Sequence, residues 1–170
     1  MTAPVINLSK GQKIDLTKTN PALCNIKVGL GWDERTTEGV KFDLDAVAFL
    51  VNSEGKCSKS NDIVFYNNPK SLCEGVVHGG DNLTGAGDGD DEFMVVDLNA
   101  IPENVQKIVL ATTIHEANAN GVSFGQVRNA FVRLVDMGSD LESADDDTEL
   151  ARFDLSEDYS IEDAMIMGEL

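Results

Sequence analysis

Short runs of Val, Ile, Phe and Leu recur along this chain of 170 residues, and Gly, Asn, Asp and Pro separate them. Runs of this length and composition, bounded by turn-forming residues, are typical of β-strands. They span residues 26–30, 42–51, 63–67, 93–98, 107–114, 130–136, 149–155 and 163–167. The pattern predicts a mainly all-β chain, folded as an antiparallel β-sandwich of about eight or more strands.

Helical periodicity is weak by comparison, so we expect at most short helices. The best helical segment is 118–129, in which Ser123 would act as the N-cap for the stretch from Phe124 to Asn129. The length fits one domain over residues 1–170, without an internal repeat or a linker.

Acidic residues dominate the charge of the chain. The 30 Asp and Glu residues outnumber the 13 Lys and Arg residues, which gives a net charge of −17. Residues 71–106 alone carry eight acids and neither Lys nor Arg. A basic face for nucleic acid is therefore excluded, and self-repulsion on this scale favours a bound cation.

The chain contains no apolar run of the roughly 18 residues that a membrane helix needs. Its first residues lack the charged start and apolar stretch of a signal peptide. Cys24, Cys57 and Cys73 fit neither a disulfide framework nor a Cys-x-x-Cys metal site. We expect a cytoplasmic protein without membrane insertion, whose thiols are reduced and mostly packed.

The residues most suited to binding a ligand are closely spaced carboxylates. Asp43 and Asp45 are two apart in a predicted strand, so both side chains lie on one face and repel each other unless a cation or protons intervene. The run 81–92 interleaves carboxylates with three glycines, and such a loop can wrap oxygen atoms around an ion. Ca²⁺ accepts this irregular oxygen geometry better than Mg²⁺, although the loop is not an EF-hand.

Other interpretations stay open at this point. A metal-dependent hydrolase would use the Asp43/Asp45 pair with a metal-bound water, and an acidic scaffold protein would bind no specific ion. A glycosidase and a nucleotide site have less support, because the paired carboxylates are neighbours on one strand and Gly29 and Gly31 belong to no phosphate-binding motif. We expect His115 to be packed and hydrogen-bonded rather than catalytic.

Several longer blocks of sequence carry a family resemblance. They are LSKG at 8–11, VGLGWD at 28–33, FDLDA at 42–46, VFYNN at 64–68, GDNLTG at 80–85, GDGDDE at 87–92, SFGQVRNAF at 123–131, ARFDLSED at 151–158 and MGEL at 167–170. In this order they resemble the TerD family of bacterial tellurium-resistance and stress proteins, over essentially the whole chain.

The resemblance implies a calcium-binding β-sandwich that acts in the stress response and in tellurite resistance as a non-enzymatic interaction module. It implies two Ca²⁺ ions in an acidic rim and partners among other tellurium-resistance proteins, some of them membrane-associated. The candidate ligands are Asp33, Asp43, Leu44, Asp45, Asn67, Asp81, Asn82, Asp88, Gly89, Asp90, Asp91 and Glu92. Leu44 and Gly89 would contribute backbone carbonyls.

Two features depart from the family pattern. Family members usually continue past Gly-Glu-Leu into further strands, whereas this sequence stops at Leu170, so we expect an exposed sheet edge. The segment from Leu141 to Asp147 is also more acidic than expected. Because tellurite is an anion and the chain is strongly negative, we expect no direct tellurite binding.

Overall fold

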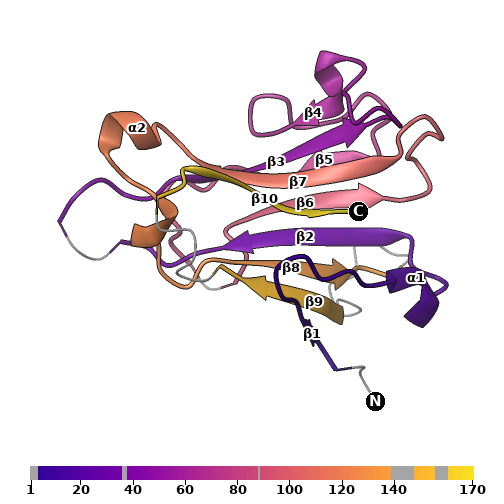
Figure 1. The fold of residues 1–170 in the computed structure, drawn as a ribbon, viewed down its shortest axis with the longest axis horizontal. Coiled ribbons are helices and arrows are strands. Elements are labelled where there is room, and N and C mark those ends of the chain that lie inside the picture. The colour runs from indigo at the N-terminus through magenta and orange to yellow at the C-terminus, as the bar shows by residue number, and fades with distance from the viewer. Residues whose placement is uncertain (1–3, 36–37, 88, 139–147, 156–160) are drawn as a thin grey trace.

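Two β-sheets, one of six strands and one of four, face each other in a computed structural model of the chain (Figure 1). The structure describes residues 4–35, 38–87, 89–138, 148–155 and 161–170. The β-sandwich predicted from the short apolar runs is therefore confirmed.

The larger sheet has the spatial order β1-β9-β8-β2-β6-β5. β1 and β9 run parallel, whereas the other neighbours are antiparallel. Its strands are β1 (Ile6–Asn7), β2 (Asn25–Gly31), β5 (Val76–His78), β6 (Glu92–Asp97), β8 (Phe131–Asp136) and β9 (Thr148–Asp154). Along β2, Ile26, Val28 and Leu30 turn into the core, so Lys27 and Gly29 lie on the outer face.

The smaller sheet is antiparallel throughout, in the order β10-β7-β3-β4. Its strands are β3 (Leu44–Val51), β4 (Ile63–Val64), β7 (Lys107–Ile114) and β10 (Ala164–Glu169). Strict alternation in β7 buries Ile108, Leu110, Thr112 and Ile114 against the other sheet.

The hydrophobic core fills the space between the sheets. Ile26, Met94 and Val96 from the larger sheet are each at most 1% exposed, and Leu44 and Ala48 from the smaller sheet are fully buried. Complete burial of an aliphatic side chain of this size stabilises a fold by roughly 1.5–3 kcal/mol. The core is thus built mainly from the apolar runs that the sequence analysis assigned to strands.

Helices are few and short. They are α1 (Leu16–Thr19), α2 (Ala117–Asn120) and the 3₁₀ turns η1 (Ser60–Asp62) and η2 (Phe124–Gln126). The helix expected over 118–129 is wrong, because Gly121 at φ 64° ends α2 after one turn. Ser123 precedes η2 but makes no capping hydrogen bond. Among the described residues, no helix has the length and hydropathy to cross a membrane.

Two short strands differ from the sequence-based expectation. The strand expected over 63–67 is only two residues long as β4, because the chain turns back at Phe65 and Asn68, which pair with each other. β1 and β5 were not expected, since two or three residues are too few for an alternating pattern to show.

The shortness of β4 determines where a site can form. β4 pairs with β3 only at Ala48 and Phe49, so it leaves the beginning of β3 uncovered on that side. The end of the loop between β5 and β6 reaches this uncovered edge, since Glu92, the first residue of β6, accepts a hydrogen bond from the amide of Ala46 (2.8 Å). An acidic loop from one sheet is thereby joined to the other sheet.

We predict that Leu50→Ala lowers the free energy of unfolding by about 3 kcal/mol, because it leaves a cavity at a side chain that is 2% exposed. Urea denaturation of the metal-free protein measures the change. Ile166→Ala is the matched control, since Ile166 is 71% exposed and its truncation should change stability by less than about 0.5 kcal/mol. Equal losses in both variants would contradict this description of the core.

Candidate metal centre

Three carboxylates meet at the uncovered beginning of β3. Asp43, Asp45 and Asp81 each place one oxygen within 4.8 Å of the oxygens of the other two. Asp45 is deeply set, with its side chain 8% exposed, and Asp43 is half-buried. We call Asp43, Asp45 and Asp81 the acidic triad.

The strand register explains how two triad members share a face. Leu44 lies between them and points into the core, fully buried, so Asp43 and Asp45 project outward. On the neighbouring strand β7, Thr113 is the register partner of Asp45 and lies on the same outer face. Its hydroxyl donates to the Asp45 carboxylate (3.4 Å). His115 Nδ1 lies 3.9 Å from Asp45 Oδ2.

The surroundings disfavour the charged form of two triad members, Asp43 and Asp45. Burial raises the pKa of Asp45 to about 6, and repulsion from Asp43, Glu92 and Asp81 adds to the effect, against a smaller attraction to His115. Burial also raises the pKa of Asp43, and the charges of Asp81 and Glu92 act in the same direction, whereas His115 opposes them. In addition, Asp43 Oδ1 is buried and has no hydrogen-bond partner in the described part of the chain.

Glu92 connects the acidic triad to both sheets. It begins β6 and is 1% exposed, and besides the Ala46 amide it accepts a hydrogen bond from the amide of Asn82 (3.3 Å). The His78 ring of β5 places Nε2 3.4 Å from the same carboxylate, while its Nδ1 accepts from the amide of Gly80 (3.2 Å). The Gly80 contact leaves the ring proton on Nε2, where it faces Glu92.

Asn82 and Asp91 hold the loop itself. The Asn82 side-chain oxygen accepts from the amides of Thr84 and Gly85, and its amide group donates to Asp91 (2.9 Å). The other Asp91 oxygen accepts from the backbone amide of Trp32 (2.8 Å). Burial raises the pKa of Asp91, and the Trp32 hydrogen bond partly offsets that. The side-chain oxygen of Asn82 is therefore used in hydrogen bonds within the loop.

Trp32 packs beneath this loop. Its ring is 3% exposed, and its Nε1 donates to the carbonyl of Phe42 (3.2 Å), one residue before the triad. Gly85 lies so close that a side chain there would collide with the indole ring. The tryptophan thus contacts both segments that supply triad carboxylates.

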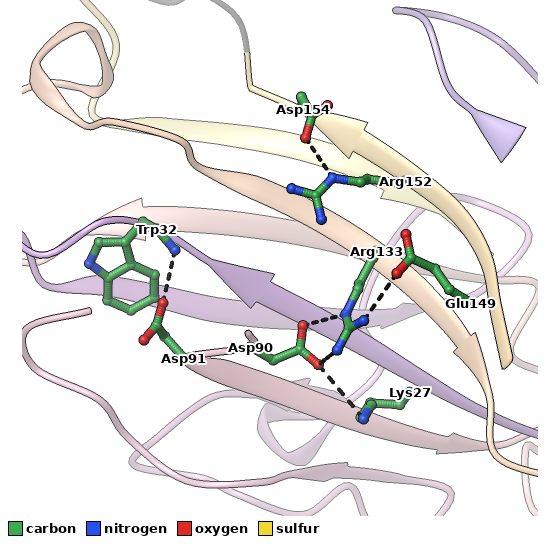
Figure 2. Close-up of polar contacts among 8 residues, drawn as sticks. All are labelled: Lys27, Trp32, Asp90, Asp91, Arg133, Glu149, Arg152 and Asp154. Carbon is green, nitrogen blue, oxygen red and sulfur yellow. Dashed lines mark hydrogen bonds and ion pairs between the residues drawn. The ribbon is translucent and has the colours of Figure 1, made fainter. Parts of the chain in front are cut away.

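Asp90 has a different environment from its neighbours. Both of its oxygens contact Arg133 of β8, at 2.6 Å from Nε and 2.9 Å from Nη2, and Lys27 Nζ lies 3.7 Å away. Figure 2 shows the Asp90 carboxylate between these two cations, while Asp91 points to Trp32. The hydrogen bonds to Asp90 raise the pKa of Arg133 above its usual range. The structure does not bring Asp90 into the triad.

The other expected ligands lie around the triad rather than in it. Asp33 is exposed and accepts from the Asn129 side chain (2.6 Å). Asn67 is exposed in the turn after β4, beside Tyr66, whose ring meets His115 edge-on. The carbonyl of Gly89 faces Gly31. Asp88 lies outside the described residues, and so does the segment 139–147, which includes all of Leu141 to Asp147.

Sequence reasoning missed the residues that support the carboxylates. His78 and Arg133 come from β5 and β8, and no spacing along the chain links them to Glu92 and Asp90. The expectation that His115 is packed is wrong, because its side chain is 44% exposed beside Asp45. The three cysteines are free and partly buried.

The raised pKa of Asp45 predicts a pH dependence. Between its ordinary pKa of about 4 and the folded value of about 6, the folded protein binds more protons than the unfolded protein, so stability falls as the pH rises. Removing this titration with Asp45→Asn should therefore raise the stability of the metal-free variant relative to wild type, progressively from pH 4.5 to pH 7. Urea denaturation in the presence of a chelator measures the difference in unfolding free energy between variant and wild type. A difference that does not change with pH would contradict the raised pKa of Asp45.

The chain is similar to known proteins over nearly its whole length. The TerD domain family model matches residues 5–170. The chain is 52% identical over 166 residues to General stress protein 16U of Bacillus subtilis (strain 168), covering 97% of this chain and 82% of that protein. It is also 52% identical over 165 residues to tellurium resistance protein TerD of Alcaligenes sp, with the same 97% and 82% coverage.

Solved structures support the fold. A homologue of the telluride resistance protein (TerD) from Streptomyces coelicolor A3(2) superimposes with a TM-score of 0.65, at 19% identity, over 86% of this chain and 80% of that chain. A crystal structure of a protein of unknown function gives a TM-score of 0.70 at 22% identity, over 87% and 80%. Since the family model spans residues 5–170 and relatives at 52% identity cover 97% of the chain, the chain belongs to the TerD domain family.

Proposed function

We propose that this protein is a calcium-binding stress-response module of the cytoplasm, in which Ca²⁺ occupies the acidic triad and orders the surrounding loops for contact with other proteins. The family supplies the context, because its named relatives are tellurium-resistance and stress proteins. The observation that carries the proposal is the buried Oδ1 of Asp43, which has no hydrogen-bond partner among the described residues and lies within a cluster of three carboxylates.

The spacing of the triad fits one cation. Calcium–oxygen distances are about 2.3–2.6 Å, so two oxygens on the same ion are at most about 5 Å apart. The triad oxygens all lie within 4.8 Å of one another, which meets this limit for all three pairs. Charged carboxylates this close stabilise a cation strongly, and without one they repel each other.

The choice of Ca²⁺ rests on the chemistry of the donors. The triad offers carboxylate oxygens from β3 and from an irregular loop, and no sulfur atom takes part in it. Mg²⁺ demands near-ideal octahedral geometry at about 2.1 Å, whereas Ca²⁺ accepts six to eight oxygens in irregular arrangements. Asp43, Asp45 and Asp81 would hold the ion, and Glu92 lies close enough to raise the pKa of two of them.

A bound ion would tie together parts of the fold that the chain brings in separately. Asp43 and Asp45 come from the four-stranded sheet, whereas Asp81 comes from the loop that leads to β6 of the six-stranded sheet. A Ca²⁺ ion at this junction would supply positive charge, and the three carboxylates would supply its oxygen ligands. The chain's residues supply the orientation, through the strand alternation at Leu44 and through Glu92 on the Ala46 amide.

A second ion fits best near Asp91. The charges of Asp33, Asp90 and Glu92 all raise the pKa of Asp91, so negative charge accumulates there as well. We propose a non-enzymatic role for both positions, in keeping with relatives that are stress and tellurium-resistance proteins. Stoichiometry decides whether one ion or two bind.

We predict that Ca²⁺ stabilises the protein by about 4 kcal/mol per ion at 1,000 times the dissociation constant. Asp45→Asn should lose most of this gain at the triad and, at pH 7 in chelator, should be more stable than wild type, because it removes a buried charge. Calorimetric titration and urea denaturation with and without Ca²⁺ measure both effects, and Trp32 fluorescence reports the loops.

Asp154→Asn is the matched control, because the Asp154 side chain is 70% exposed and pairs with Arg152 at 2.7 Å, in a strand that supplies no triad carboxylate. It should bind Ca²⁺ as wild type does. Mg²⁺ at equal concentration should stabilise the wild type much less. An unchanged calcium response in Asp45→Asn, or none in the wild type, would overturn the proposal.

A further inference from the structure

Two glycines on the outer face of β2 create a flat strip under the end of the acidic loop. Gly29 and Gly31 are two apart and so lie on the same face. A side chain on Gly29 would collide with the Asp90 carboxylate, and one on Gly31 would come within 2.5 Å of the Gly89 carbonyl oxygen. Residues 89 and 90 therefore rest directly on the backbone of β2.

Arg133 closes this seat from the neighbouring strand. It is the register partner of Gly29 across β8, and its guanidinium binds both oxygens of Asp90. The third guanidinium nitrogen, Nη1, donates to Glu149 of β9 (3.0 Å) and so fixes the orientation of the guanidinium group (Figure 2). The Asp90 side chain is only 7% exposed. A bidentate pair with this little exposure is geometrically specific and costly to break.

The seat fixes the residues that follow it. Immediately after Asp90, the amide of Asp91 donates to the carbonyl of Leu30 (2.8 Å), and the Asp91 carboxylate accepts from Trp32. Glu92 then turns into the space between the sheets and reaches the amide of Ala46. Asp90 is thus the last fixed point before the carboxylates that surround the triad.

We propose that the Gly29/Gly31 strip and the Arg133 guanidinium form a seat for Asp90, and that this seat sets calcium affinity by positioning the acidic loop, while Asp90 itself does not bind the ion. The inference rests on the calcium-binding function proposed above. Site rigidity tunes calcium affinity, and residues that orient ligands from behind commonly change metal affinity by 10- to 100-fold.

Simple electrostatics predicts that calcium affinity rises, not falls, when the positive charge of Arg133 is removed. An acidic site that has lost a positive charge should attract Ca²⁺ more strongly. Asp90, freed from Arg133, would also be available as an extra ligand and would strengthen binding further. A seat predicts weaker binding, because the loop loses its fixed point. The direction of the change in affinity therefore separates positioning from charge.

Four variants separate these effects in the full-length chain. Arg133→Lys keeps the charge but loses the two-pronged hydrogen bond, and Arg133→Gln loses both. Gly29→Ala changes no charge and displaces the Asp90 carboxylate. Lys27→Gln is the matched control, because it removes a positive charge 3.7 Å from the same carboxylate without touching the guanidinium fork.

Calcium affinity is measured by competition with a chromophoric chelator. Arg133→Lys, Arg133→Gln and Gly29→Ala should each bind Ca²⁺ about tenfold more weakly than wild type. Lys27→Gln should bind at least as tightly as wild type. In metal-free protein, the Asp91 and Trp32 amides should exchange with solvent about tenfold faster in the first three variants, while the amides that pair β2 with β6 keep their protection.

The outcomes are distinct. Wild-type affinity in Arg133→Lys and Gly29→Ala, or tighter binding in Arg133→Gln, would overturn the seat while leaving the calcium site in place. Loss of protection throughout β2 and β6 would show that the variants damage the sheet instead, and would also count against the seat. Absence of calcium binding in the wild type would remove the proposed function, and the seat's role in affinity with it.

Discussion

The repulsion among Asp43, Asp45 and Asp81 is the constraint on which the rest of the site depends. Their carboxylate oxygens lie within 4.8 Å of one another, and burial together with the neighbouring negative charges raises the pKa values of Asp43 and Asp45. They remain together because the β3 register puts two of them on one face while Leu44 anchors the strand in the core. The energy that packs Leu44 thus holds the charges in place, and a cation is the partner that this arrangement favours.

The loop between β5 and β6 shows how an acidic segment is kept in order. Each of three successive carboxylates has its own partner: Arg133 for Asp90, the Trp32 amide for Asp91, and the Ala46 amide with His78 for Glu92. These three carboxylates are therefore paired within the fold rather than solvated at the surface.

The sequence predicted most of the fold but only part of the site. The short apolar runs located β2, β3, β6, β7, β8, β9 and β10 to within a residue or two, because buried strands need apolar and β-branched residues and turn-forming residues separate them. Sequence reasoning gave too long a strand at β4 and a helix over 118–129 that Gly121 interrupts. Among the expected ligands, the structure gathers Asp43, Asp45 and Asp81, whereas it pairs Asp90 with Arg133.

The sequence by itself determined the family, the two-sheet class and the presence of paired acids, since motifs and apolar runs are local properties of the chain. Tertiary structure alone decided which acids meet. The short β4 exposes the edge of β3, and the strip at Gly29 and Gly31 admits the loop backbone. These contacts join residues far apart in the chain, such as Asp45 with Asp81 and Asp90 with Arg133, and only the packing of the two sheets sets such distances.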